Sequence, residues 1–267
     1  MLSKIAVIQM CSSDILRDNL ERAQVLITEA SENGAKWLVL PENFAMMGDV
    51  TAQLRYKESF GAGPIQTFLA EQAQKNDVWI VAGTIPIASA QDNKVRAACL
   101  VFDAQGKCVA RYDKIHLFDV TVSAAEVYRE SDTTEPGNHI TVLNTPFGTL
   151  GLAVCYDIRF SELFRCLLQQ GADIIVLPAA FTETTGKAHW EVLARSRAIE
   201  NGCYFVGACQ GGTHANGRKT YGHSIVVDPW GKILVESQHA EIIYASLDLE
   251  KVKEVRKLLP MQTPLWG

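Results

Sequence analysis

The chain has 267 residues, of which 48% are hydrophobic and 21% are charged, and this composition excludes disordered, collagen-like and low-complexity proteins. Its formal net charge of −5 argues against nucleic acid or an anionic membrane surface as a partner, because both call for a basic face. The seven cysteines show no C-x-x-C spacing and the six histidines form no ligand pair, so we expect neither a disulfide scaffold nor a metal site.

Short apolar runs alternate with helical patterns along the chain, which predicts a layered α/β fold. The first run begins at residue 4, too early for a signal peptide to precede it, and no apolar run reaches the roughly 18 residues of a membrane span, so we expect a cytoplasmic protein. Strands are predicted at 4–10, 37–41, 78–85, 97–103, 150–155, 173–178, 204–209, 224–228 and 242–247, and helices at 16–33, 64–75, 160–170, 189–201 and 250–258.

The sequence contains an internal repeat. The segment Gly34–Phe44 recurs as Gly171–Phe181, and each copy consists of an apolar strand that ends at a proline. Upstream of each copy lies a further strand, at residues 5–8 in the first half and 152–155 in the second, and each of these strands is followed by a helix. We therefore predict two strand–helix–strand halves related by a pseudo-twofold axis. They would form a two-sheet core with outer helices in one domain that spans residues 1–267.

Three residues near the ends of predicted strands could carry chemistry. Cys155 ends an apolar strand just before a helix, where terminal N–H groups favour a thiolate and could receive an oxyanion. Glu42 lies at the kind of sheet rim where α/β sites form, and an apolar setting suits it to general-base catalysis. Lys114 offers a positive charge to an oxyanion or thiolate. Taken singly, each also fits a structural role, as a core cysteine, a capping acid and a solvated lysine. In the two copies of the repeat, Glu42 corresponds to Ala179 and Cys155 corresponds to Ile8, so the candidate reactive residues are not themselves repeated.

Taken together and in this order, the motifs resemble the nitrilase superfamily of carbon-nitrogen hydrolases, whose catalytic set is Glu, Lys and Cys. The resemblance implies a four-layer α–β–β–α sandwich with no metal or organic cofactor. The second glutamate of the family matches Glu130, with Glu126 as a lower-ranked competitor. The matching stretches cover essentially the whole chain and are Leu40–Phe44, Tyr112–Phe118, Gly151–Phe160, Gly186–Glu191, Arg197–Asn201, Tyr221–Ser224 and Asp228–Gly231.

The resemblance also implies a thioester mechanism. Glu42 would take the thiol proton of Cys155, and the thiolate would attack a planar amide carbonyl. Lys114 and the Tyr156 backbone N–H would stabilise the oxyanion. After the amine leaves, water activated by Glu42 would release the carboxylic acid, while Glu130 would position Lys114 or the substrate.

Within the superfamily, the segments around Cys155 resemble amidases that act on α-keto acid amides, and residues 208–223 resemble the deaminated glutathione amidases. We therefore expect a thiol amidase acting on deaminated glutathione. The alternatives are an ω-amidase acting on 2-oxoglutaramate or 2-oxosuccinamate, an N-carbamoyl amino acid hydrolase or a nitrilase. A non-catalytic interaction protein of the same fold is disfavoured by the complete catalytic set.

The expected substrate-binding residues are Tyr156, Arg159, Phe181, Thr182, His189, Gln210 and Tyr221. Arg159 could pair with a substrate carboxylate, or internally with Asp157 or Glu162. Arg197 and Asn201 are expected in a structural network within a helix face. The family suggests a homodimer or a larger homo-oligomer, and the apolar C-terminal residues 258–266 are a candidate interface.

Overall fold

The protein is described from a computed structural model, which covers residues 2–49, 51–124 and 126–261. Residues 262–266 of the candidate interface lie outside the described residues. The strands of the two large sheets are β1 (Leu2–Ile8), β2 (Trp37–Val39), β3 (Trp79–Val81), β4 (Ile85–Ala88), β5 (Val95–Phe102), β6 (Cys108–Asp113), β9 (Val142–Thr145), β10 (Gly148–Leu152), β11 (Ile174–Ala179), β12 (Tyr204–Cys209), β15 (Ser224–Val227), β16 (Ile233–Ser237) and β17 (Ile242–Asp248).

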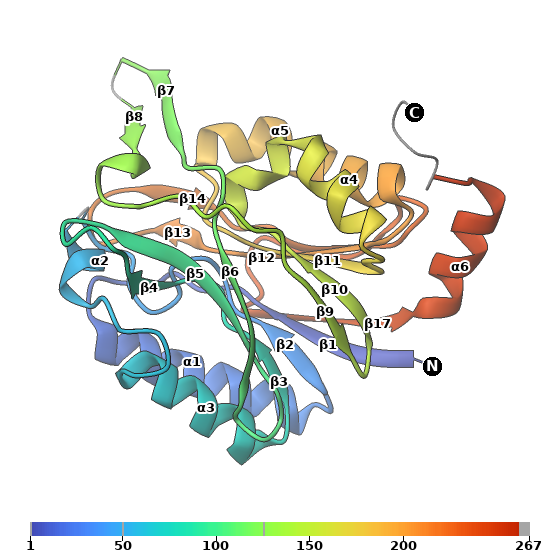
Figure 1. The fold of residues 1–267 in the computed structure, drawn as a ribbon, viewed down its shortest axis with the longest axis horizontal. Helices are drawn as coiled ribbons and strands as arrows, with labels where there is room; N and C mark the ends of the chain where they lie inside the picture. The colour runs from blue at the N-terminus through green and yellow to red at the C-terminus, as the bar shows by residue number, and fades with distance from the viewer. Residues whose placement is uncertain (1, 50, 125, 262–267) are drawn as a thin grey trace.

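Two short hairpins and eight helical segments complete the described elements (Figure 1). The hairpins are β7 (Asp119–Ser123) with β8 (Glu126–Arg129), and β13 (Gly211–Thr213) with β14 (Lys219–Tyr221). The helices are α1 (Leu16–Glu32), α2 (Ala52–Arg55), α3 (Pro64–Asn76), α4 (Ser161–Gln169), α5 (Glu183–Asn201) and α6 (Leu249–Leu258), with the 3₁₀ turns η1 (Glu130–Asp132) and η2 (Cys155–Arg159).

The two large sheets have equivalent strand arrangements. The first sheet runs β17–β1–β2–β3–β5–β4, with β6 also paired to β5, and the second runs β16–β15–β12–β11–β10–β9. Three parallel strands lie in the middle of each sheet, β1, β2 and β3 in one and β10, β11 and β12 in the other. Antiparallel strands flank them on both sides. This equivalence confirms the pseudo-twofold relationship predicted from the repeat.

Each sheet buries both of its faces. In Figure 1, α1 and α3 cover the outer face of the first sheet, and α4 and α5 cover the outer face of the second. Along β1, Ile5 and Val7 face the core between the sheets, whereas Ala6 and Ile8 pack toward the helices. Strands that are buried on both faces read as continuous apolar runs. The layering confirms the predicted α–β–β–α sandwich.

Among the described residues, no helix is long and apolar enough to cross a membrane.

Several element boundaries differ from the prediction. The segment predicted as one strand over 78–85 is divided into β3 and β4, because Gly83 adopts a positive φ of 57° and packs against the Pro41 carbonyl. A Cβ at Gly83 would lie 1.9 Å from that oxygen, so no other residue fits this approach. Helix α5 begins six residues earlier than predicted, because the Thr182 hydroxyl accepts a hydrogen bond from the Thr185 N–H (3.2 Å). The two hairpins and the strands β6, β9 and β16 were not predicted.

Candidate active site

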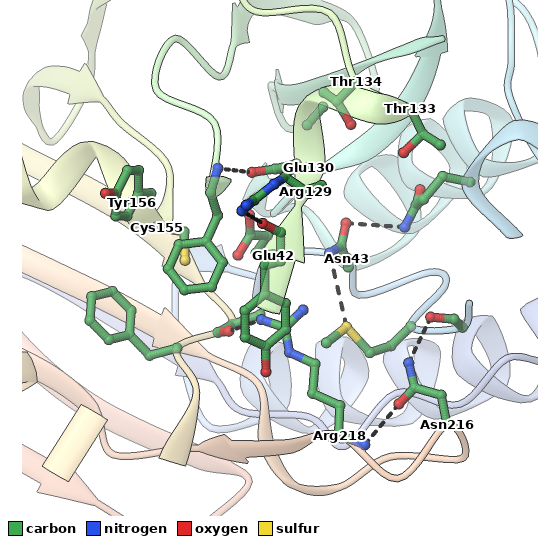
Figure 2. A pocket seen from close by; sticks show the side chains of 18 of the residues that line it. Glu42, Asn43, Arg129, Glu130, Thr133, Thr134, Cys155, Tyr156, Asn216 and Arg218 are labelled. Atoms are coloured by element: carbon green, nitrogen blue, oxygen red, sulfur yellow. Dashed lines mark hydrogen bonds between the residues drawn. The ribbon is translucent and has the colours of Figure 1, made fainter. Parts of the chain in front are cut away.

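A cavity of about 790 Å³ lies where the two halves of the fold meet. Glu42, Lys114, Glu130 and Cys155, which come from four separate segments, all line it. Figure 2 shows Glu42 and Glu130 close together, with Cys155 and Tyr156 on the neighbouring wall. The structure thus gathers in one cavity the four residues that the sequence singled out as catalytic.

Cys155 is the first residue of η2 and lies at the sharp turn that follows β10. Its φ of 46° is unusual for a residue with a side chain, and such strain concentrates at functional sites. Asp157 stabilises the turn, because its Oδ2 accepts a hydrogen bond from the Val154 N–H (2.8 Å). Cys155 therefore begins a short helix whose first N–H groups lack intrahelical partners and can bind an oxyanion.

Asp157 also connects this turn to the segment that carries Lys114. It is fully buried and accepts hydrogen bonds from the Tyr112 hydroxyl (2.7 Å) and the His116 N–H (3.0 Å), and His116 Nδ1 lies 2.7 Å from Oδ1. Lys114 lies between Tyr112 and His116 in the sequence. One carboxylate thus fixes the position of the lysine relative to the cysteine, a role that the sequence analysis missed.

Lys114 is 2% exposed and lies between two carboxylates. Its Nζ donates to Glu42 Oε1 (2.9 Å) and to Glu130 Oε2 (2.8 Å). Burial alone would lower the pKa of the ammonium, but the charges of Glu130 and Glu42 outweigh it and hold that pKa well above its ordinary value. Lys114 therefore stays a cation and cannot act as a base.

The two candidates for the second glutamate occupy different positions. Glu130 contacts Lys114 and also accepts a hydrogen bond from the Phe118 N–H (2.6 Å). Glu126 lines the cavity but contacts the Tyr128 and Thr184 hydroxyls (3.1 and 3.2 Å). The geometry therefore favours Glu130 as the partner of Lys114.

The thiol of Cys155 is buried, with 6% of the residue exposed. Burial, followed by the negative charge of Glu42, raises the pKa of this thiol well above its ordinary value. The charge of Lys114 and a hydrogen bond from the Ala180 backbone act in the opposite direction without reversing the shift. The resting nucleophile is therefore a thiol, which needs a base, and Glu42 is hydrogen-bonded to it.

Gln210 supports Glu42 instead of lining the cavity. Its fully buried amide accepts a hydrogen bond from the Ser12 N–H (3.0 Å) and donates to the Ser12 hydroxyl (2.8 Å) and the Glu42 carbonyl (3.0 Å). The sequence predicted Gln210 as a substrate-binding residue. All of these contacts are internal, however, and Gln210 is not among the residues that line the cavity. The side chain joins the end of β12 in one half to the base in the other.

The remaining predicted binding residues divide into two groups. Tyr156 and Phe181 line the cavity. The other four do not line the cavity. Thr182 is buried as the cap of α5, Tyr221 stacks on His223, and Arg159 and His189 contact each other (3.3 Å). Arg159 also lies over the rings of Tyr156 and Phe181, and it pairs with neither of the two acids that were considered for it.

The cavity is also lined by residues that the catalytic motifs did not indicate. The hairpin β7–β8 contributes Tyr128 and Arg129, and the turn before β14 contributes Arg218. Arg218 belongs to residues 208–223, the segment that resembles the deaminated glutathione amidases, and its positive charge in that segment already marked it as a donor for the leaving group. Arg197 and Asn201 form the expected structural network, since Arg197 donates to the Ile158 carbonyl (2.8 Å) and Asn201 to that of Arg197 (2.9 Å). No cluster of His, Cys, Asp and Glu able to hold a metal ion occurs among the described residues.

Comparison with known proteins assigns the family. Residues 4–257 match the carbon-nitrogen hydrolase family. The chain is 41% identical to a deaminated glutathione amidase of Yersinia enterocolitica, over 97% of this chain and 91% of that protein, and 38% identical to the human omega-amidase NIT2, over 97% and 93%. The crystal structure of the C. elegans NitFhit protein superposes with a TM-score of 0.90 at 35% identity, covering 97% of this chain and 64% of that longer one. The chain therefore belongs to the carbon-nitrogen hydrolase family.

Proposed function

We propose that the protein is a thiol amidase with Cys155 as nucleophile, Glu42 as general base, and Lys114 with the Tyr156 N–H as oxyanion donors. The observation that carries the proposal is the buried cluster in which Glu42 contacts both the thiol and Lys114. In the first stage the thiol proton passes to Glu42 while sulfur bonds to the amide carbon. The carbonyl oxygen becomes an oxyanion held by Lys114 and the backbone N–H.

The intermediate then collapses, and the carbon–nitrogen bond breaks as Glu42 returns the proton to the leaving amine. The product is a thioester on Cys155. In the second stage Glu42 takes a proton from water, the hydroxide adds to the thioester carbonyl, and the carboxylic acid leaves as the proton returns to sulfur. Glu130 keeps Lys114 oriented and protonated throughout, since it holds the ammonium with both carboxylate oxygens (3.0 and 2.8 Å).

The proposed substrate is deaminated glutathione, an α-keto acid joined by an amide bond to a Cys-Gly leaving group. Two observations support it. The relative at 41% identity is a deaminated glutathione amidase, and the cavity of about 790 Å³ falls in the upper part of the range for small-molecule sites, about 300–1,000 Å³. The second candidate is 2-oxoglutaramate, which has the same α-keto acyl half without the dipeptide. The omega-amidase relative at 38% identity supports this alternative.

A competition assay separates the two substrates. Both are offered to one enzyme sample, and the rates of Cys-Gly and ammonia release are compared. We expect kcat/KM for deaminated glutathione to exceed that for 2-oxoglutaramate at least about tenfold, or about 1.4 kcal/mol of transition-state binding. Equal rates, or a preference for 2-oxoglutaramate, would assign the protein to the ω-amidases. Nitriles and N-carbamoyl amino acids serve as further competitors, and we expect neither to be turned over.

We also propose a cytoplasmic homodimer or larger homo-oligomer. At the end of α6, Leu258 and Leu259 are 70% and 44% exposed, and such apolar residues mark contact surfaces when they cluster. Light scattering on the purified protein measures the mass directly. A monomer at micromolar concentration would contradict the proposal.

A further inference from the structure

Arg218 is a partly buried cation that lacks a carboxylate partner within the described residues. Its Nη2 donates to the Ala180 carbonyl (2.8 Å), and its Nε is buried without a hydrogen-bond partner. Four other partly or fully buried arginines are paired with an acid, namely Arg96 with Glu135, Arg111 with Asp113, Arg197 with Glu200 and Arg256 with Asp173. Arg159 is also partly buried without an acid, but it contacts His189 and does not line the cavity. A desolvated guanidinium without a counter-charge is costly, so its presence in a cavity points to an anionic ligand.

The side chain is held ready for such a ligand. Its guanidinium lies 5.0 Å from the centre of the Tyr128 ring, which supports it from the hairpin β7–β8. Figure 2 shows Arg218 in the wall of the cavity that faces Glu42. The backbone of Ala180 contacts both side chains, because its carbonyl accepts a hydrogen bond from Arg218 while its N–H hydrogen-bonds to the Cys155 thiol. The backbone of one residue therefore connects Arg218 to the reacting sulfur.

The position of Arg218 on the chain indicates which part of the substrate it meets. Asn216, Gly217 and Lys219 are exposed, so the arginine reaches inward from the rim of the cavity. During turnover the acyl half stays bonded to Cys155 while the leaving group departs and water replaces it. The leaving group must therefore lie toward the open rim, where Arg218 is anchored.

The acids on this wall already have partners. Glu126 is hydrogen-bonded to Tyr128 and Thr184, and Glu183 pairs with Lys187 (2.9 Å). Neither contacts Arg218. The guanidinium thus keeps donors for a ligand, and a guanidinium suits the planar, two-oxygen geometry of a carboxylate.

We propose that Arg218 is the binding site for the carboxylate of the leaving group, which in deaminated glutathione belongs to the glycine. The inference rests on the proposed function and extends it to a residue that determines specificity. An amide whose leaving group carries no carboxylate gains nothing from this arginine. The Cys-Gly amide gains a charge-assisted hydrogen bond in a site partly removed from water.

The test compares Arg218→Met with the wild type on three substrates, namely deaminated glutathione, the same compound with its glycine carboxylate replaced by a carboxamide, and 2-oxoglutaramate. Loss of a charge-assisted contact predicts a fall of about 10–100-fold in kcat/KM for deaminated glutathione. The other two substrates should change by less than about threefold. Arg218→Lys, which keeps the charge without the planar fork, should recover part of the loss on deaminated glutathione only.

Arg195→Met is the matched control, because it removes the same charge from the exposed face of α5, outside the cavity lining. It should leave all three substrates unchanged. An equal loss on all three substrates in Arg218→Met would overturn the inference, because the arginine would then act only by supporting Ala180. Failure of the proposed function looks different, because the wild type itself would then turn over 2-oxoglutaramate but not deaminated glutathione.

Discussion

Replacing Gln210 by leucine removes the support of the general base while keeping the side-chain volume similar. The Ser12 N–H and the Glu42 carbonyl would lose the partners they have in Gln210. Each buried polar group left unsatisfied costs about 1–3 kcal/mol, so the free energy of unfolding should fall by about 2–6 kcal/mol. A shift of about 1 Å in a catalytic group costs on the order of 10² in rate. We therefore expect kcat to fall about 10–100-fold with little change in KM.

Gln66→Leu provides the matched control. Gln66 is also buried, accepts from the Gly61 N–H (2.8 Å) and donates to Glu58 (3.0 Å) and the Ser59 carbonyl (2.8 Å), but it lies at the start of α3 and does not line the cavity. Urea denaturation should show a similar loss of stability in both variants, while kcat should fall only in Gln210→Leu. If Gln210→Leu raised KM and left kcat intact, Gln210 would be a substrate-binding residue and the reasoning from its internal contacts would be refuted.

Three further predictions concern the ionisable groups. Cys155→Ala should abolish turnover while the circular dichroism spectrum and Tm remain close to wild type; measurable thioester formation in this variant would exclude Cys155 as the nucleophile. Lys114→Ala should lower kcat about 10²–10³-fold, since it removes an oxyanion donor, and a change in KM alone would make Lys114 a binding residue. Burial raises the pKa of the Cys203 thiol to about 12 and also raises that of Cys99, so above about pH 8.5 the folded state holds protons that the unfolded thiols have lost. Unfolding free energies, measured in urea with a reductant, should therefore fall from pH 8.5 to 10. Cys203→Ala should flatten this slope by up to about 1.4 kcal/mol per pH unit, and an unchanged slope would contradict the linkage.

The sequence predicted well those features that depend on burial and repetition. The two copies of the strand–proline segment form β2 and β11, which occupy equivalent places in their sheets. Both strands could be predicted because they are buried on two faces and are therefore apolar throughout. Glu42 and Cys155 could be located because each follows such a strand. The hairpin β7–β8 was missed because its side chains alternate between exposed and half-buried positions, and it has no apolar run.

The orientation of side chains at strand ends could not be predicted in the same way. Gln210 follows β12, and whether its amide meets the substrate or the Glu42 carbonyl depends on how two segments 168 residues apart are packed. The same applies to Arg159, whose neighbours include His189 in a helix from another part of the chain. Local patterns carry no information about such contacts, which tertiary packing alone determines.

The pairing of β17 with β1 has a consequence for the order in which the protein is made. Ile8 pairs with Ile242, so the strand that covers the edge of the first sheet is translated about 230 residues after the strand it covers. At 5–20 residues per second, the ribosome needs on the order of 10–50 s to supply it. Throughout that time β1 presents unpaired backbone groups on a strand whose residues Ile5–Ile8 become fully buried, which is the kind of edge that mispairs with other chains. A nascent chain that has not yet reached β17 is thus a natural client for chaperones, and the first sheet closes only after Ile242–Asp248 has been translated.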